Sequence, residues 1–600
     1  MRVTDYILSC IEQLGIKDIF YLPGGGAMYF NDALAKNKNI NPISCHHEQA
    51  CGISAEAYGR VSPAKFGVAI VTTGPGSTNV LTPLVGAWIE SLPMLIISGQ
   101  VKRADLLKDR KIRQGGVQEV DVLSMIKKVT KYSVSINNLK YLNKELKKCF
   151  SLMMDDRPGP VWLEVPLDIQ SQSVDYLNDD FIHQLFNHKS KKKLLKINKD
   201  KIKNILKGSR RPLFLIGHGV RISGAKDQLI KVIKKFQIPC VFTWNAFDLL
   251  EYDDQLNVGR PGVVAMRGPN FAIQNCDCLI SIGSRIDNII TGYNPKNFAK
   301  YAKKIIVDID KNELSKLEFK AEYKVNIDAK AFLEILLKID DLVIDSKQWV
   351  RTCNSWKKRY PFFDKQKKLN NNSHYEFVDN LSRVINDDTQ IITGSSGLAV
   401  EIFYTGFRNK KNQRIFLTSG LGSMGYGLAA SIGACIGSEK KPTICLESDG
   451  SFMLNIQELA TIRHLNLPIK IIIMNNNGYA SIRNTQKNYF EERYVGTSID
   501  SGLLIPDLCK ISKSFGIPAK NINRISDLTH INDYPAPFLF NVKLSEEEVL
   551  EPKATAIPQP DGSIISMPLE DMSPLLPRKV LKKEMINPLN PASLKIKDEI

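Results

Sequence analysis

Two polar turns in the last third of the sequence contain residues that could together hold a metal ion. The turns are Ser448-Asp449-Gly450-Ser451 and Asn475-Asn476-Asn477-Gly478, and each follows a short apolar run. A helical segment separates the two runs, so the pattern predicts a βαβ unit with parallel strands. Such strands end at the same edge of a sheet, which brings Asp449 and Asn476 together. A carboxylate, an amide oxygen and the carbonyl of Gly478 form an oxygen set that suits Mg²⁺.

The backbone N–H groups of Gly450 and Ser451 open the predicted helix and could bind phosphate oxygens beside this metal. Taken alone, Asp449 and Asn476 are equally typical of an ordinary strand-turn-helix-turn. The complete string, however, resembles the diphosphate-binding signature of thiamine-diphosphate (ThDP) enzymes, in which GDG is followed by a double asparagine. Ser448 replaces the first glycine of that signature. The resemblance implies that Asp449, Asn476 and the carbonyl of Gly478 bind Mg²⁺.

Length and composition favour a large globular protein. The 600 residues imply several domains, and 43% hydrophobic with 24% charged residues is an ordinary balance. The eleven cysteines are scattered and contain no CxxC pair, which argues against a zinc site or a disulfide framework. The N-terminus lacks the features of a signal peptide, and no apolar run reaches membrane-spanning length. We therefore expect a soluble, cytoplasmic protein with no membrane partner.

A net charge of +18 raises the question of nucleic-acid binding. The basic runs lie at 189–193 and 578–583, in an expected linker and an expected tail, and no aromatic residues interleave them. Lysine is abundant along the whole chain. We therefore expect no nucleic-acid partner, and attribute the charge to compositional bias and to attraction of an anionic substrate.

Apolar runs such as 67–71 and 94–97 alternate with helical segments, which predicts an α/β fold of three doubly wound parallel-sheet domains followed by an irregular C-terminal tail. For the tail we expect an ordered cap over the active site and a loose end beyond about residue 580. The expected boundaries are a first domain at 1–172, a linker at 173–208, a middle domain at 209–345, a second linker at 346–374, a third domain at 375–545 and the tail at 546–600.

Glu48 is the candidate acid–base residue of the first domain. An isolated glutamate is usually a surface residue, and the adjacent His46 and His47 are poorly spaced to share one metal ion with it. The string HHEQACGISAEAYGR, followed by TTGPGSTN, resembles the pyrimidine-binding domain of ThDP enzymes. In that setting Glu48 would bind N1′ of the aminopyrimidine ring and share its proton, which promotes loss of the proton from thiazolium C2.

Gln118 is the second candidate catalytic residue. Its loop resembles the family loop that ends in FQEVD, with Val117 in place of the usual phenylalanine. The resemblance implies that Gln118 faces the substrate, and an ordinary loop amide is the alternative.

Further ThDP contacts are implied by glycine turns and by the string SGLGSMGYG, which resembles a family segment whose methionine supports the cofactor in a bent shape. Met424 alone would be typical of a hydrophobic core. The additional expected ThDP-binding residues are Gly25, Ser395, Ser396, Gly422 and Met424.

A different cofactor is implied for the middle domain. Its lone G-x-G turn is weak evidence for a dinucleotide. The string GSRIDNIITG at 283–292 resembles GARFDDRVTG of acetolactate synthases, which carry FAD in this domain. The alternative is a domain that has lost its flavin. The implied FAD-binding residues are Arg157, Gly217, Gly219, Gly283 and Arg285.

The resemblance covers nearly the whole chain and points to acetolactate synthase large subunits, which serve branched-chain amino acid biosynthesis. It implies a homodimer or homotetramer with ThDP held between subunits. The implied reaction is decarboxylation of a 2-keto acid, pyruvate, and ligation of the two-carbon unit to an acceptor carbonyl.

The acceptor stays open between a second keto acid and a nucleotide-linked keto sugar. Val117, Ser481 and Thr485 stand where acetolactate synthases carry bulkier Phe, Met and Trp, which favours a roomier acceptor site. This pattern and the tail resemble ThDP enzymes of surface-polysaccharide pathways. A non-catalytic cofactor-binding scaffold is a further alternative, which only Ser448 supports.

Overall fold

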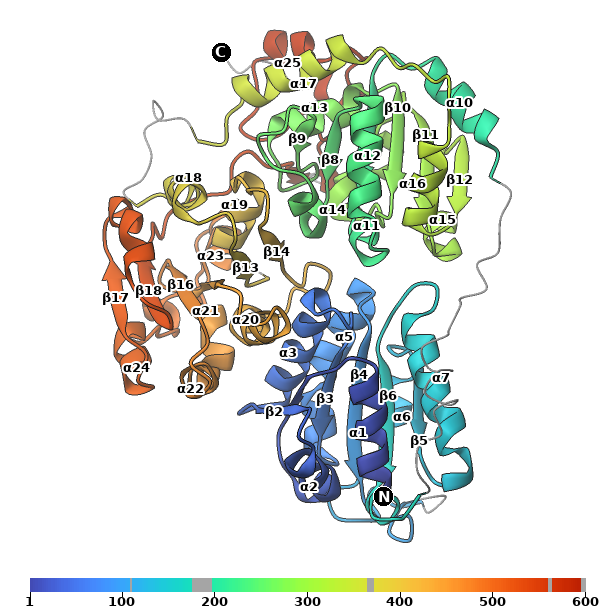
Figure 1. Cartoon of the computed structure of the whole chain (residues 1–600). Helices are drawn as coiled ribbons and strands as arrows, with labels where there is room; N and C mark the ends of the chain where they lie inside the picture. The colour runs from blue at the N-terminus through green and yellow to red at the C-terminus, as the bar shows by residue number, and fades with distance from the viewer. Residues whose placement is uncertain (108–110, 175–196, 364–371, 396, 559–563, 595–600) are drawn as a thin grey trace.

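The computed structural model describes residues 1–107, 111–174, 197–363, 372–395, 397–558 and 564–594. The chain folds into three α/β domains, each with a six-stranded parallel sheet flanked by helices (Figure 1). In this view the middle domain lies above the first domain, and the third domain lies beside both. The predicted fold class is confirmed.

The first sheet has the strand order β2-β1-β3-β4-β6-β5, and all of its strand pairs are parallel. Strands β3 and β4 are buried along their whole length, as expected for a parallel sheet covered on both faces. The strands are β1 (Asp18–Tyr21), β2 (Asn41–Ser44), β3 (Gly67–Val71), β4 (Met94–Gln100), β5 (Tyr132–Ser135) and β6 (Val161–Pro166). The helices are α1 (Val3–Gln13), η1 (Gly25–Ala27), α2 (Met28–Lys36), α3 (Glu48–Val61), α4 (Pro75–Asn79), α5 (Leu81–Glu90), α6 (Val122–Ile126), η2 (Leu139–Tyr141), α7 (Leu142–Met154) and α8 (Leu167–Gln170).

The second sheet forms the middle domain and has the parallel order β12-β11-β10-β7-β8-β9. Its strands are β7 (Pro212–Ile216), β8 (Cys240–Phe242), β9 (Asn257–Gly259), β10 (Cys278–Ile282), β11 (Lys303–Asp308) and β12 (Tyr323–Asn326). The helices are α10 (Lys199–Lys207), α11 (Gly219–Ile222), α12 (Lys226–Phe236), η3 (Trp244–Leu249), α13 (Arg267–Asn275), α14 (Asn288–Thr291), η4 (Pro295–Asn297), α15 (Lys311–Ser315), α16 (Ala329–Leu337) and α17 (Lys347–Arg359).

The third sheet has the parallel order β14-β13-β15-β16-β18-β17. Its strands are β13 (Gln390–Thr393), β14 (Arg414–Phe416), β15 (Thr443–Ser448), β16 (Ile469–Asn475), β17 (Ala519–Ile522) and β18 (Phe538–Lys543). The helices are α18 (His374–Val384), α19 (Leu398–Gly406), α20 (Tyr426–Gly437), α21 (Asp449–Phe452), η5 (Met453–Glu458), α22 (Leu459–His464), α23 (Ala480–Tyr489), η6 (Ile499–Ser501), α24 (Leu508–Ser514) and η7 (Ile525–Asp533).

Each sheet has a topological switch point, where chain connections leave in opposite directions and ligands of open α/β sheets bind. The switch points lie between β1 and β3, between β7 and β10, and between β13 and β15. The turns that follow these strands approach one another closely. An ideal Cβ on Gly217, after β7, would lie 2.1 Å from the carbonyl oxygen of Gly283, after β10. The predicted glycine turns therefore lie where the topology places binding sites.

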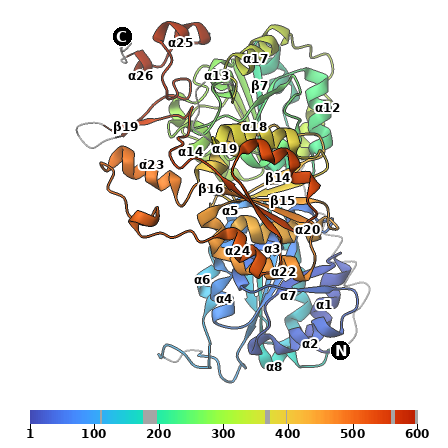
Figure 2. The ribbon, with the colours of Figure 1, turned by 90° about the vertical axis from the view of Figure 1, so that its left-hand side faces the viewer.

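The first and third domains share one hydrophobic core, because α3 packs directly against α20 (Figure 2). The Oγ of Ser54 on α3 donates a hydrogen bond to the carbonyl oxygen of Ala429 on α20 at 2.8 Å. Gly433 permits the close approach, since an ideal Cβ there would lie 1.9 Å from the carbonyl oxygen of Ser54.

Both expected linkers contain helices that belong to the middle domain. Residues 199–207 form α10, which buries Ile202, Ile205 and Leu206. Residues 347–359 form α17, which buries Trp349, Cys353 and Trp356. Each of these helices has an apolar stripe that packs on the middle domain.

The tail carries a short hairpin of β19 (Ala556–Pro558) and β20 (Ile564–Ser566), then α25 (Arg578–Glu584) and α26 (Pro591–Leu594). We expected a loose end beyond about residue 580, but the chain is folded as far as residue 594. Glu584 accepts hydrogen bonds from the indole of Trp356 and from Arg359, so the end of the tail packs on α17 of the middle domain. Among the described helices, none is long and apolar enough to cross a membrane.

We expect Gly433→Ala to destabilise the protein by about 1–3 kcal/mol, because the new methyl group would overlap backbone that cannot move independently. Thermal melting would show this as a lower midpoint. Gly208→Ala is the matched control, since Gly208 ends α10 with φ −90° and nothing lies within 4 Å of its ideal Cβ. Equal melting of both variants and the unaltered protein would contradict this account of the α3–α20 contact.

Candidate active site

Asp449 and Asn476 lie at the same edge of the third sheet. Strands β15 and β16 pair in register with Ser448 opposite Met474, so the two polar turns begin side by side. The turns are also tied together directly, because the backbone N–H of Gly478 donates to Oδ2 of Asp449 at 2.9 Å. The structure thus brings together the residues that the sequence predicted to meet.

The donor set at this edge fits a divalent cation. Burial raises the pKa of Asp449 to about 6, and the backbone N–H groups of Gly478 and Gly450 oppose that rise by stabilising the carboxylate. Asn476 is only 4% exposed, and among the described residues its Oδ1 has no hydrogen-bond partner. A buried oxygen of this kind requires an electropositive partner. Asp449 and Asn476 could therefore hold Mg²⁺, and their role as ligands stays a prediction.

The turn after β16 is held in an unusual conformation. Gly478 has φ +124°, and an ideal Cβ there would lie 2.3 Å from the carbonyl oxygen of Thr497, so only glycine fits. Arg483 on α23 donates to the backbone carbonyl of Asn476 at 2.7 Å. The backbone on both sides of the candidate ligands is thereby fixed.

The turn after β15 is connected to the segment that carries Met424. The Oγ of Ser451 accepts a hydrogen bond from the backbone N–H of Gly425 at 2.8 Å, directly beside the half-buried Met424. Gly450 faces the ring of Tyr479, and an ideal Cβ there would lie 2.3 Å from that ring. Residues 424 and 449–451, predicted to contact one cofactor, are thus neighbours.

The remaining predicted ThDP contacts are less informative. Ser395 follows β13 and donates its hydroxyl hydrogen bond to the carbonyl of Ser423. Gly422 has φ +69°, which favours glycine. Gly25 is exposed at the start of η1, with nothing within 4 Å of an ideal Cβ. Ser396 lies outside the described residues.

Glu48 is the first residue of α3 and is buried, at 7% exposure. Its Oε2 accepts a hydrogen bond from Asn79 at 3.0 Å. The neighbouring Gln49 accepts a hydrogen bond from Asn455 at 3.3 Å, and the same Asn455 amide donates to the carbonyl of Gly425 at 2.8 Å. A short hydrogen-bonded chain therefore connects the start of α3 to the Met424 segment.

Gln118 is exposed and has φ +63°. Its backbone carbonyl packs on Gly74, where an ideal Cβ would lie 2.0 Å away, so its loop rests on the 72–79 segment that also contacts Glu48. The neighbouring Val117 is 85% exposed. Buried Glu119 holds the loop by accepting hydrogen bonds from the backbone N–H groups of Leu107, Gly115 and Gly116.

A second candidate site is a cavity of about 820 Å³ lined by residues from all three domains. Four of the five residues predicted to bind FAD line it: Arg157, Gly219, Gly283 and Arg285. Gly217 does not line it, and instead permits the contact between the two glycine turns described above.

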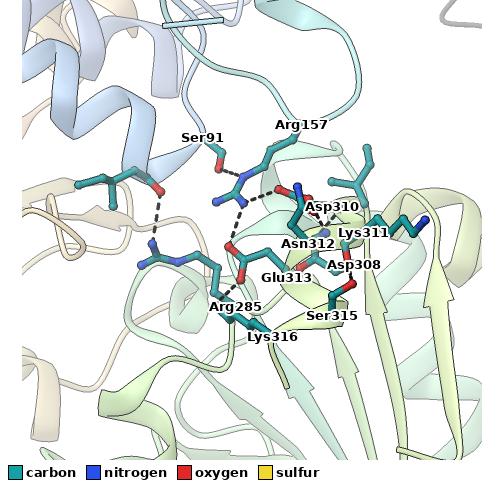
Figure 3. Close-up of polar contacts among 12 residues, drawn as sticks. Ser91, Arg157, Arg285, Asp308, Asp310, Lys311, Asn312, Glu313, Ser315 and Lys316 are labelled. Atoms are coloured by element: carbon teal, nitrogen blue, oxygen red, sulfur yellow. Dashed lines mark hydrogen bonds and ion pairs between the residues drawn. The ribbon is translucent and has the colours of Figure 1, made fainter. Parts of the chain in front are cut away.

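Arg157 reaches from the first domain to the acidic start of α15 in the middle domain (Figure 3). Its Nε donates to the Oγ of Ser91 at 2.7 Å, and its Nη1 donates to Asp310 and to Glu313, each at 2.9 Å. Because two carboxylates already balance its charge, Arg157 contributes mainly by holding the cavity walls together. Arg285 approaches the same region from the middle domain.

Three arginines that the sequence reasoning did not identify also line this cavity: Arg60, Arg221 and Arg414. Each also pairs with a carboxylate, Arg60 with Glu56 and both Arg221 and Arg414 with Asp248. One nitrogen of each (Nη1, Nε and Nη2, respectively) nevertheless has no acceptor among the described residues. Burial and the nearby arginines keep the pKa of His218, also in the lining, well below its usual value, so its ring is neutral. Only Arg221 lies near a predicted glycine turn, so the sequence gave little indication that these three arginines line one cavity.

A buried histidine beside the candidate metal ligands was missed as well. His374 begins α18, and its Nε2 lies 3.3 Å from Nδ2 of Asn476. Burial, reinforced by the charge of Arg483, lowers the pKa of His374 to about 3, so its ring is neutral. The two residues are 102 positions apart in sequence, so no local motif could link them.

Comparison with known proteins agrees with this arrangement. Thiamine pyrophosphate enzyme family models match the N-terminal TPP binding domain at residues 1–125, the central domain at 200–336 and the C-terminal TPP binding domain at 393–533. The acetolactate synthase large subunit of Lactococcus lactis is 29% identical over 92% of this chain and 94% of that protein. The isozyme 2 large subunit of Escherichia coli is 28% identical over 96% and 100%, and the large subunit of Pyropia yezoensis is 30% identical over 90% and 92%. The chain therefore belongs to the thiamine pyrophosphate enzymes, as an acetolactate synthase-like member of that family.

Proposed function

We propose that this enzyme depends on ThDP and Mg²⁺, decarboxylates pyruvate and ligates the remaining two-carbon unit to an acceptor carbonyl. The observation that carries the proposal is the oxygen set at the edge of the third sheet. The turns that carry Asp449 and Asn476 lie beside each other there, and the buried Oδ1 of Asn476 has no partner in the part of the chain that the structure describes. This set suits Mg²⁺, which would anchor the diphosphate.

When bound, ThDP supplies the electron sink that accepts the electron pair released as CO₂ leaves. The chain's own residues would hold the cation and orient the cofactor. Asp449, Asn476 and the carbonyl of Gly478 would hold the cation, and Met424 would support the cofactor's bend. Glu48, buried at the start of α3, would hold a proton at the aminopyrimidine ring.

A homodimer is the smallest assembly that we propose, and a homotetramer is compatible with it. Exposed large apolar side chains follow the Gly478 turn along α23 and the loop after it, and surfaces of this kind mark interaction sites. They are Ile482, Tyr489, Phe490, Tyr494, Val495, Ile499 and Leu504. A second subunit that covers this surface would also shield the neighbouring metal edge from water.

FAD is the proposed occupant of the second cavity. A volume of about 820 Å³ lies within the range of cofactor sites. The unsatisfied donors of Arg60, Arg221 and Arg414 suit an anionic group such as a diphosphate.

Two acceptors are compatible with the site, a second 2-keto acid and a nucleotide-linked keto sugar. Ser481 and Thr485 lie one turn apart on α23, directly after the Gly478 turn, and Thr485 is exposed. Their small size and the exposed Val117 loop favour a roomy approach to the site, which supports the sugar as the second candidate.

We expect Glu48→Gln to retain ThDP binding but to slow exchange of the cofactor's C2 proton by about 10²–10⁴-fold, because an amide cannot share a proton with the ring. Deuterium exchange followed by NMR would measure this rate. Glu439→Gln, which alters a carboxylate 81% exposed, is the control. Undiminished exchange in Glu48→Gln would show that Glu48 has another role.

The proposed reaction and its acceptor are tested by measuring CO₂ release and pyruvate consumption with and without a nucleotide-linked keto sugar. Release of CO₂ that requires Mg²⁺ and ThDP is expected. Its absence in protein that has bound both would favour a non-catalytic scaffold. Acetolactate formed from pyruvate alone would identify a keto acid as acceptor and remove the case for the sugar.

We expect the purified protein to bind FAD, and Arg285→Ala to weaken that binding at least tenfold, because the arginine lines the cavity. Visible absorbance and equilibrium dialysis would measure bound flavin. Arg210→Ala alters an exposed arginine of the same domain and serves as the control. Protein that binds no flavin even in excess FAD would contradict the proposal.

A further inference from the structure

His374 is buried directly against the candidate metal ligand Asn476. Its two ring nitrogens have different surroundings. Nε2 lies 3.3 Å from Nδ2 of Asn476, and Nδ1 lies 3.9 Å from a carboxylate oxygen of Glu548. The same oxygen accepts the backbone N–H of His374 at 3.1 Å, which fixes the carboxylate beside the ring.

This arrangement selects one tautomer of the imidazole. A neutral imidazole has one N–H donor and one acceptor nitrogen. Nε2 of His374 faces the amino group of Asn476, which can only donate, so Nε2 is the acceptor and the ring hydrogen lies on Nδ1. Nδ1 lies too far from Glu548 for a hydrogen bond and has no hydrogen-bond partner among the described residues. Only the amino group of the Asn476 side chain can donate to Nε2. The amide oxygen of Asn476 must then point the other way.

We propose that His374, supported by Glu548, is a positioning residue that orients the amide of Asn476 so that its oxygen is presented to the bound cation. The inference rests on the proposed function, because it concerns the Mg²⁺ ligand set. Arg483 already fixes the backbone of Asn476, so rotation of the side-chain amide is the main freedom that remains. A rotated amide would turn an electropositive amino group toward the metal. Partners of this kind behind a ligand contribute strongly to metal affinity.

The alternative is that His374 only fills space in the core, and two substitutions separate these roles. His374→Phe keeps an aromatic ring but removes the acceptor nitrogen. His374→Gln can place an amide oxygen near the position of Nε2 and so restore an acceptor. A space-filling role predicts that the phenylalanine variant is the milder change, whereas positioning predicts the reverse.

The readout is Mg²⁺ affinity in the presence of saturating ThDP, measured by calorimetry on the full-length protein, with thermal melting alongside. We expect His374→Phe to weaken Mg²⁺ binding about 10–100-fold and His374→Gln to stay within about threefold of the unaltered protein. Should His374→Phe fail to fold, Glu548→Gln takes its place, with an expected loss of about three- to tenfold because the backbone N–H of His374 loses its carboxylate acceptor and the ring is held less firmly.

Unchanged Mg²⁺ affinity in His374→Phe, or an equal loss in the glutamine and phenylalanine variants, would overturn the inference while leaving the proposed function standing. Unchanged affinity in Glu548→Gln would overturn the part assigned to the carboxylate. If the unaltered protein bound ThDP with no dependence on Mg²⁺, the proposed function would fail and this inference with it.

Discussion

The main physical constraint on this protein is the parallel pairing of β15 and β16, which allows the Gly478 amide to donate a hydrogen bond to Asp449. Two turns can meet at 2.9 Å only because β15 and β16 are parallel, adjacent and in a fixed register. The meeting brings the turn with the buried carboxylate of Asp449 against the turn of Asn476, whose buried amide oxygen has no hydrogen-bond partner within the described chain. Backbone geometry therefore shapes the proposed metal site before any side chain is adjusted.

The same constraint recurs in the other two domains and explains where glycine is required. At these two switch points a glycine of one turn lies against the next turn with no room for a side chain: Gly217 packs on the backbone of Gly283, and Gly24 packs on the side chain of Thr72. Glycine at these positions therefore reflects close packing as much as ligand contact. Gly25 has open space around it, so close packing does not explain this glycine, and its place in a glycine-rich motif does not by itself reveal its role.

Sequence reasoning predicted the features that depend on local order along the chain. The run at 67–71 forms β3, and the βαβ pattern was sufficient to bring Asp449 and Asn476 together. It did not identify α10 and α17 as helices of the middle domain, although the apolar residues 202, 205 and 206 have helical spacing, because the high lysine content favoured a linker. Arg60, Arg414 and His374 could not be found in this way, because the groups they join are distant in sequence and only the packing of the domains brings them together.

The buried polar groups left without partners have a common energetic consequence. An unsatisfied buried donor or acceptor costs about 1–3 kcal/mol, and the described chain retains such atoms on Asn476 at one site and on Arg60, Arg221 and Arg414 at the other. The proposed Mg²⁺ and FAD would supply the missing partners at these two sites. Because each ligand would bind only the folded protein, binding at either site would also stabilise the fold. Glu48 begins α3, and Met424 lies just before α20. These two helices pack together in the core that the first and third domains share, so the stability of this core also holds Glu48 and Met424 in position.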